Sequence, residues 1–256
     1  MCQDHPMTRS PAPPGTVLTV APVQVRQDTA PRPAAEVAAA AEDCARVGAA
    51  AVDLVPDAGL AETVAAVRER TSLLVRITAH ARGETLTGLL DAGSHIISCP
   101  LSAPAEFAAD LREGARERGI AVHHEARSPA DLAALREVPA PTHVVLVFGA
   151  GLTGDVPGFA AALGQLPEGT SCTATGLGEA GVPVLLTALA AGAHVRTGMA
   201  DHAGYAPGVR AKDDAQLAAR AAGVAKIAQR PPLPPAQAAP ILGVGTPGSG
   251  ISGAGT

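Results

Sequence analysis

Short apolar runs alternate along the chain with Ala-rich stretches of helical spacing. Each run is continuously apolar, as expected of strands that are buried on both faces of a parallel sheet. Glycine (28 residues) and proline (23 residues) are frequent enough to separate many short elements. Strands are predicted at Thr16–Val23, Ala50–Pro56, Leu73–Thr78, His95–Leu101, Ile120–Glu125, His143–Phe148, Ser171–Gly178 and His194–Met199.

Amphipathic helices are predicted between these strands. Pro33–Val47 and Pro104–Arg118 place apolar side chains at helical spacing and carry their charges on the other side. Ser128 followed by Pro129 marks a helix start, with serine as the N-cap and proline at the first helical position. The last long helix is predicted at Lys212–Gln229.

Eight strand–helix units between residues 16 and 230 predict an α/β fold, a single-domain (β/α)₈ TIM barrel. A doubly wound sheet would use fewer units and would usually show a glycine-rich nucleotide loop after its first strand. Residues 24–28 contain no glycine, which favours the barrel. The barrel is expected over 16–241, with a flexible N-terminal segment at 1–15 and a flexible Gly/Ser-rich tail at 242–256.

Composition excludes two classes of partner. The chain of 256 residues has a formal net charge of −5, one Tyr and no Trp, which argues against nucleic-acid binding. No run approaches the roughly 20 apolar residues of a membrane span. The first 15 residues lack the apolar segment of a secretory signal, and Cys99 and Cys172 lie in apolar runs. We therefore expect a cytoplasmic protein with reduced, buried thiols.

Polar residues at the carboxyl ends of the strands are the candidates for chemistry, because active sites of this fold lie at that end of the barrel. These residues are Gln24, Arg26, Asp53, Asp57, Thr78, His80, Ser98, Cys99, His123, His124, Glu125, Glu179, Arg196, Asp201 and His202.

The run His123-His124-Glu125 suggests metal binding. Neighbouring side chains on a strand point to opposite faces, so that His123 and Glu125 can converge while His124 cannot. A catalytic zinc site needs a third ligand, such as Asp53 or His80. The alternative is that one histidine faces the helix layer and the other is a hydrogen-bonded residue of the pocket, and the sequence favours this alternative.

Arg196 and Asp201 form a more specific constellation. An arginine inside a barrel is costly unless it is paired or binds an anion, and a carboxylate five residues later is within reach. Such a carboxylate holds the guanidinium and can act as a base. A structural ion pair that closes the last strand explains the two residues equally well.

Two other signals are weak. The segments Gly176-Leu177-Gly178 and Gly149-Ala150-Gly151 suggest phosphate binding, but neither matches a P-loop or a dinucleotide fingerprint. Lys212 and Lys226, the only lysines, lie on or near the last long helix, which argues against Schiff-base chemistry.

Several segments together resemble the β-keto acid cleavage enzymes, such as the 3-keto-5-aminohexanoate cleavage enzyme of lysine fermentation. The most specific part is Gly192-Ala193-His194-Val195-Arg196-Thr197-Gly198 followed by Asp213-Asp214-Ala215-Gln216-Leu217. The similarity extends from about Thr16 to Val244 and also includes Thr16–Val23, Ala49–Leu54, Gly176–Gly178, Pro183–Leu186 and Ala239–Gly243.

The resemblance implies a (β/α)₈ barrel and metal-dependent acyl exchange. A zinc ion would polarise the keto group of a β-keto acid, whose Cα–Cβ bond is cleaved in a retro-Claisen sense. Acetyl-CoA would accept the released acyl group, which gives acetoacetate and a new CoA ester. Relatives tend to be oligomeric, so the resemblance also implies a homo-oligomer.

The departures from the family pattern concern the metal. The family's zinc-binding His-x-His at the end of the second strand reads Asp53-Leu54-Val55, and its third ligand, a glutamate, is replaced by Ala200. Valine and alanine carry no donor atom for zinc. The family's acidic residue after the first strand falls near Arg26, and its Ser-Thr-Gly-Gly stretch reads Thr78-Ala79-His80-Ala81.

Two functions remain open. In the first, a divergent enzyme uses Arg196, Asp201 and Thr78 for catalysis and Arg26, His80 and Gly178 for substrate binding, and any metal would rest on Asp53 and His123. In the second, a barrel that has lost its metal binds a small anion or a partner protein without catalysis. Arg26, His80, His123 and Arg196 are expected to make the mouth electropositive, so that either function predicts a small carboxylate ligand.

Overall fold

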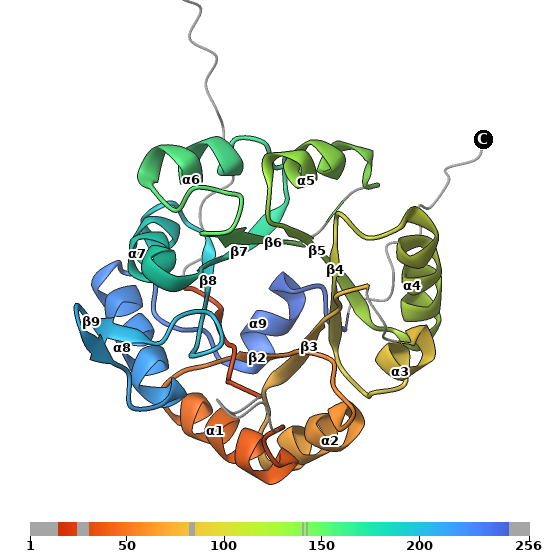
Figure 1. Ribbon diagram of the computed structural model, residues 1–256, viewed down its shortest axis with the longest axis horizontal. Helices are drawn as coiled ribbons and strands as arrows, with labels where there is room; N and C mark the ends of the chain where they lie inside the picture. The colour runs from red at the N-terminus through yellow and green to blue at the C-terminus, as the bar shows by residue number, and fades with distance from the viewer. Residues whose placement is uncertain (1–14, 25–30, 82–84, 140, 142, 246–256) are drawn as a thin grey trace, which may run out of the picture.

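The computed structural model describes residues 15–24, 31–81, 85–139, 141 and 143–245. Its eight central strands are parallel and close into a barrel in the order β1 to β8, which confirms the predicted fold (Figure 1). The strands are β1 (Leu18–Val20), β2 (Ala51–Leu54), β3 (Leu74–Thr78), β4 (Ile96–Pro100), β5 (Ala121–Ala126), β6 (His143–Phe148), β7 (Ser171–Gly176) and β8 (His194–Thr197).

Helices surround the barrel (Figure 1). They are α1 (Ala34–Arg46), α2 (Leu60–Arg70), α3 (Leu86–Leu90), α4 (Ala105–Arg118), α5 (Pro129–Ala134), α6 (Val156–Leu163), α7 (Gly181–Ala190) and α8 (Asp214–Ile227), with 3₁₀ turns at Leu135–Glu137 and Gly178–Ala180. The predicted N-cap at Ser128 is confirmed, because its hydroxyl accepts a hydrogen bond from the backbone N–H of Asp131, whose carboxylate in turn accepts from the N–H of Ser128. The strands match their predicted ranges to within a few residues at either end.

Strand β2 contributes to two cores, because successive side chains on a strand point to opposite faces. Val52 and Leu54 of β2 lie in the main hydrophobic core together with residues of the surrounding helices. Their neighbours Ala51 and Asp53 face the interior of the barrel, where Ala51 belongs to a second, smaller cluster. Because both faces of the strand are buried, its sequence is apolar at every position except where an inward-facing residue, such as Asp53, is polar.

A short helix that the sequence did not predict closes the amino-terminal end of the barrel. This helix, α9 (Pro235–Ile241), lies within the ring of strands in Figure 1. Its residue Ala238 and the following Leu242 pack against Val17, Leu74 and Ile96, which lie at the amino-terminal ends of their strands. Leu242, which the sequence placed in the flexible tail, is therefore buried. The site lies at the opposite end.

A second unpredicted feature is an antiparallel hairpin of β9 (Gly204–Ala206) and β10 (Val209–Arg210) between β8 and α8. Cys99 and Cys172 are buried, and neither takes part in a disulfide among the described residues, as the sequence predicted. Within the described ranges, no helix combines the length and the apolar character that crossing a bilayer requires.

Candidate active site

Polar side chains from five strands face the interior at the carboxyl end of the barrel. Each lies two positions from another inward-facing residue and alternates with apolar residues of the main core. They are Asp53 of β2, Arg76 and Thr78 of β3, Glu125 of β5, Thr175 of β7 and Arg196 of β8, joined by Asp201 from the turn after β8. All of these residues are buried.

The predicted pair of Arg196 and Asp201 forms, and it is bidentate. Arg196 Nη2 donates to Asp201 Oδ1 over 2.7 Å, and Arg196 Nε donates to Asp201 Oδ2 over 3.1 Å. The hydroxyl of Thr175 also donates to Asp201 Oδ2, over 2.9 Å. Three donors therefore fix the orientation of this carboxylate.

The backbone holds Asp201 in this position. Its carbonyl oxygen accepts a hydrogen bond from the N–H of Gly178, and its own N–H donates to the carbonyl of Gly198. A Cβ at Gly198 would lie 2.1 Å from the carbonyl oxygen of Ala21, so that only glycine permits this turn to pack on β1. The N–H of Gly178 is thus already used, and this residue is a support for Asp201 rather than an open donor for substrate.

Asp53 is the centre of the buried network. Its Oδ2 accepts from Arg76 Nη2 over 2.7 Å and from Arg196 Nη1 over 2.6 Å, and its Oδ1 accepts from the Thr78 hydroxyl over 2.8 Å. Burial by itself would raise the pKa of this carboxyl, but the two guanidinium groups and these hydrogen bonds lower the pKa to about 2. Asp53 is therefore an anion that binds arginine.

Glu125 extends the network towards the rim. Its Oε1 accepts from Arg127 Nε over 2.6 Å, and its Oε2 lies 3.9 Å from Arg196 Nη1. The side chain of Glu125 is fully buried, yet Oε2 has no hydrogen-bond partner among the described residues. Charges thus alternate from Arg127 through Glu125, Arg196 and Asp53 to Arg76.

The buried histidines do not join this network as metal ligands. His123 Nε2 lies 3.0 Å from the carbonyl oxygen of Leu242, at the end of α9, so it is the protonated nitrogen. Burial is the main cause that lowers the pKa of His123, to about 3, and its ring is neutral. His124 faces the opposite side of β5, where burial, with Arg112 of α4, lowers its pKa to about 4.

The donor set does not fit zinc. Val55 and Ala200, which stand at two of the three zinc-ligand positions that the resemblance to the family implies, have no side-chain donor atom. The side-chain amide of Gln24 also binds the backbone N–H and carbonyl of Val55. The predicted metal residues Asp53 and His123 bind arginine and Leu242, respectively. In the part of the chain that the structure describes, no three His, Cys, Asp or Glu side chains gather as a metal site.

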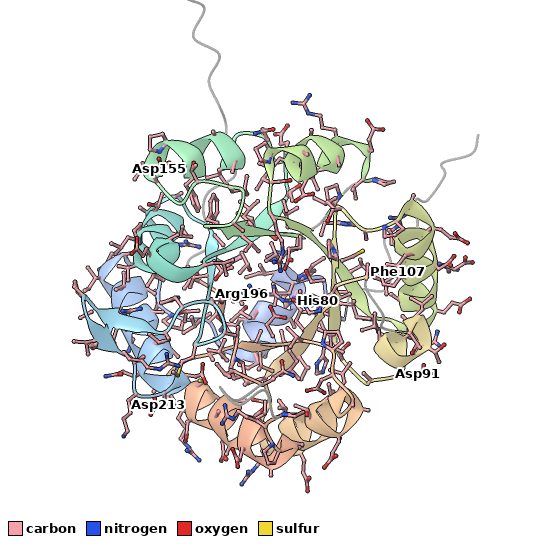
Figure 2. All side chains as sticks on the ribbon, viewed as in Figure 1. His80, Asp91, Phe107, Asp155, Arg196 and Asp213 are labelled. Carbon is pink, nitrogen blue, oxygen red and sulfur yellow. The ribbon has the colours of Figure 1, made fainter. Side chains whose placement is uncertain are left out.

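The remaining predicted residues fall into different places. Thr78 is in the network through Asp53, and His80 is exposed and lies, like Arg196, near the middle of the barrel in Figure 2. Arg26 is outside the described residues. The two buried guanidinium groups of the network, Arg76 and Arg196, are paired with carboxylates. The electropositive character expected at this end of the barrel stays a prediction, because it also depends on Arg26.

Three residues of the site were not predicted, namely Arg76, Arg127 and Thr175. Arg76 had a visible signal, since it is the one charge in the run Leu74–Thr78 and shares the inward face of β3 with Thr78. An isolated charge in a buried strand needs a partner of opposite sign, which Asp53 supplies. Thr175 and Arg127 carried no comparable signal, because hydroxyl groups and rim arginines are common.

Comparison with known proteins identifies the family. A family model for the beta-keto acid cleavage enzymes matches residues 16–244. The chain belongs to this family. A 3-keto-5-aminohexanoate cleavage enzyme from Acetoanaerobium sticklandii is 30% identical over 115 residues, which are 44% of this chain and 42% of that enzyme. The match thus spans less than half of the relative's length.

Solved structures confirm the barrel. The apo structure of ObcA has a TM-score of 0.67 at 13% identity and matches over 83% of this chain and 65% of its own. A 3-hexulose-6-phosphate synthase has a TM-score of 0.58 at 19% identity, over 83% of this chain and 99% of its own. At these identities the likeness concerns the fold alone.

Proposed function

We propose that this member of the family cleaves a β-keto acid by acyl exchange with acetyl-CoA and does so without zinc. Family membership supports the reaction class. The observation that carries the proposal is the bidentate pair of Arg196 and Asp201, buried at the end of the barrel where TIM-barrel enzymes do their chemistry. The loss of donors at Val55 and Ala200 supports a mechanism that needs no bound metal.

Asp201 serves as the acid–base group in this proposal. The carbon between the two carbonyl groups of a β-keto acid is an acidic C–H position, and a fixed carboxylate can take its proton. Thr175 and Arg196 hold Asp201 in one orientation, which reduces the entropic cost of reaching the reactive geometry.

Arg196 supplies the positive charge beside the developing enolate. A guanidinium has five N–H groups, and three hydrogen bonds from Arg196 to carboxylates leave donors for a substrate oxygen. Preorganised donors of this kind stabilise negative charge that forms in the transition state. The Cα carbanion would attack the thioester carbonyl of acetyl-CoA, so that a new C–C bond forms and CoA thiolate leaves. The thiolate would then attack the original keto carbon, and the Cα–Cβ bond would break. This gives a new CoA ester and the enolate of acetoacetate, which takes back the proton from Asp201.

A non-catalytic barrel that binds a small anion is the second candidate. The observation in its favour is that the buried charges of the mouth neutralise one another, since Asp53 and Asp201 between them hold both Arg76 and Arg196. Such a closed network can be purely structural.

Turnover in metal-free buffer separates the two candidates. The purified protein is dialysed against EDTA, its zinc content is measured, and it is incubated with a panel of β-keto acids and acetyl-CoA while acetoacetate is followed by mass spectrometry. We expect acetoacetate from at least one acid, unchanged by EDTA and abolished in Asp201→Asn. Absence of turnover across the panel would favour the binding protein, and stoichiometric zinc would overturn the metal-free mechanism.

A further inference from the structure

Arg127 has unused hydrogen-bond donors at the rim of the site. Its Nε donates to Glu125, but its two terminal nitrogens have no partner among the described residues. The side chain is 43% exposed, whereas that of Glu125 is fully buried. One edge of the guanidinium thus faces inwards and the terminal edge faces solvent.

The other two guanidinium groups of the network are buried and already use part of their N–H groups to bind carboxylates. Arg196 spends three hydrogen bonds on Asp53 and Asp201, and Arg76 is buried against Asp53. An incoming anion at either position would compete with carboxylates that are already in place. Of the three arginines in the network, Arg127 is the one whose two terminal nitrogens have no partner among the described residues.

The position of Arg127 is fixed in advance. Its backbone N–H donates to Asp131 Oδ2 over 2.8 Å, its carbonyl accepts from the N–H of Leu152 over 3.0 Å, and Glu125 holds Nε over 2.6 Å. Binding to a side chain that is already ordered costs less conformational entropy than binding to a free one.

Glu125 provides an independent sign that the site is incomplete. Its Oε2 is buried without a hydrogen-bond partner among the described residues, and buried carboxylate oxygens are rarely left unpaired. A water molecule or a ligand that carries a hydrogen-bond donor can fill this position. The terminal nitrogens of Arg127 and the Oε2 atom of Glu125 thus belong to two paired side chains and have no hydrogen-bond partner among the described residues.

We propose that the terminal edge of Arg127 binds the carboxylate or phosphate group of the acidic ligand, in the end-on bidentate geometry that guanidinium groups form with such anions. This assignment places the anionic group of the ligand at Arg127 rather than at the substrate-binding residues Arg26, His80 and Gly178 that the sequence predicted. It rests on the proposed function only in that a β-keto acid or a CoA ester would bring such a group to the mouth.

Binding is measured by isothermal titration calorimetry with acetoacetate and, separately, with inorganic phosphate, so that the carboxylate and the phosphate are distinguished. Arg127→Ala should weaken the binding of at least one of them about tenfold or more, and Arg127→Lys should restore part of it. The matched control is Arg118→Ala, because Arg118 is 38% exposed and donates its Nε to Asp91 on the outside of the barrel.

A second variant distinguishes loss of binding from loss of the folded structure. Arg127→Ala leaves the buried charge of Glu125 with only the more distant Arg196, whereas Glu125→Gln/Arg127→Ala removes both charges and should fold and still fail to bind. Wild-type protein that binds neither anion, or the same affinity in Arg127→Ala and in Arg118→Ala, overturns the proposal. The calorimetry requires no turnover, so a protein that binds through Arg127 but forms no acetoacetate supports this site while refuting the proposed reaction.

Discussion

Arg196 Nη1 donates a hydrogen bond to Asp53 Oδ2 over 2.6 Å, and this bond joins β8 to β2, the two strands that flank β1. Because Arg76 binds the same oxygen, one carboxylate lies between two guanidinium groups. Asp53 is thus the shared counter-ion of Arg76 and Arg196.

Removing this counter-ion should destabilise the protein strongly. Asp53→Asn leaves Arg76 without a carboxylate partner among the described residues, and it leaves Arg196 with Asp201 and the more distant Glu125. Breaking a buried ion pair from one side costs about 3–5 kcal/mol. Urea denaturation followed by circular dichroism measures the change in the free energy of unfolding.

The matched control is Asp91→Asn, since Asp91 is 55% exposed and pairs with Arg118 on the surface. We expect it to cost less than about 1 kcal/mol. Replacing both buried partners in Asp53→Asn/Arg76→Met should cost less than the sum of the single changes. Equal effects of Asp53→Asn and Asp91→Asn would show that the buried network does not stabilise the fold.

Acid should weaken the fold in a window set by Asp53. The pKa of this carboxyl is lowered from 3.8 to about 2 in the folded protein, because Arg76 and Arg196 outweigh the effect of burial. Its stabilisation is therefore complete above the unfolded value and is lost as the pH falls from about 4 to about 2, to the extent of about 2 kcal/mol. The difference in the free energy of unfolding between the wild type and Asp53→Asn should therefore shrink by about 2 kcal/mol between pH 5 and pH 2.

The buried histidines make the stability of the fold depend on pH over a higher pH range than Asp53 does. Burial lowers the pKa of His123 to about 3 and that of His194 to about 4, both from 6.5. The unfolded chain binds these protons first, so stability falls as the pH drops below about 6.5. His123→Gln should reduce this slope between pH 6 and pH 4, and a slope equal to that of the wild type would contradict a neutral, buried His123.

The fold was readable from the sequence because the strands that build it are uniformly apolar and the helices are amphipathic. The pair of Arg196 and Asp201 was also predictable from the sequence. Asp201 follows Arg196 by five positions and lies in the turn directly after the strand, so that its carboxylate can reach back to the guanidinium. Asp53 was found, but its partner Arg76 was not, because the spacing of two strands along the chain says nothing of which side chains meet across the barrel. His123 was assigned to the carboxyl end of the barrel because no pattern in the sequence indicated that α9 closes the other end.

The contact of α9 with the barrel should contribute measurably to stability. Leu242 is 1% exposed, packs with Ile96 and Leu74, and gives its carbonyl oxygen to His123. Leu242→Ala leaves a cavity beneath the barrel and should cost about 2–4 kcal/mol. Ile227→Ala, at an 81% exposed residue of α8, is the control and should change the free energy of unfolding by less than about 0.5 kcal/mol. Similar values for both variants would mean that α9 is not part of the core.

Arg196→Lys tests whether the geometry of the guanidinium, and not only its charge, is needed for turnover. Lysine keeps the positive charge but has no planar fork for Asp201, and it cannot bind Asp201 and Asp53 at the same time with the present spacing. Loss of a preorganised donor typically lowers kcat by about 10²–10³-fold. The formation of acetoacetate should therefore fall to that extent in kcat, while Thr175→Val, which removes one hydrogen bond from Asp201, should reduce kcat by a smaller factor. If Arg196→Lys instead raises KM with an unchanged kcat, Arg196 binds the substrate in its ground state, and Asp201 has to be oriented for proton transfer by Thr175 and the backbone of its turn.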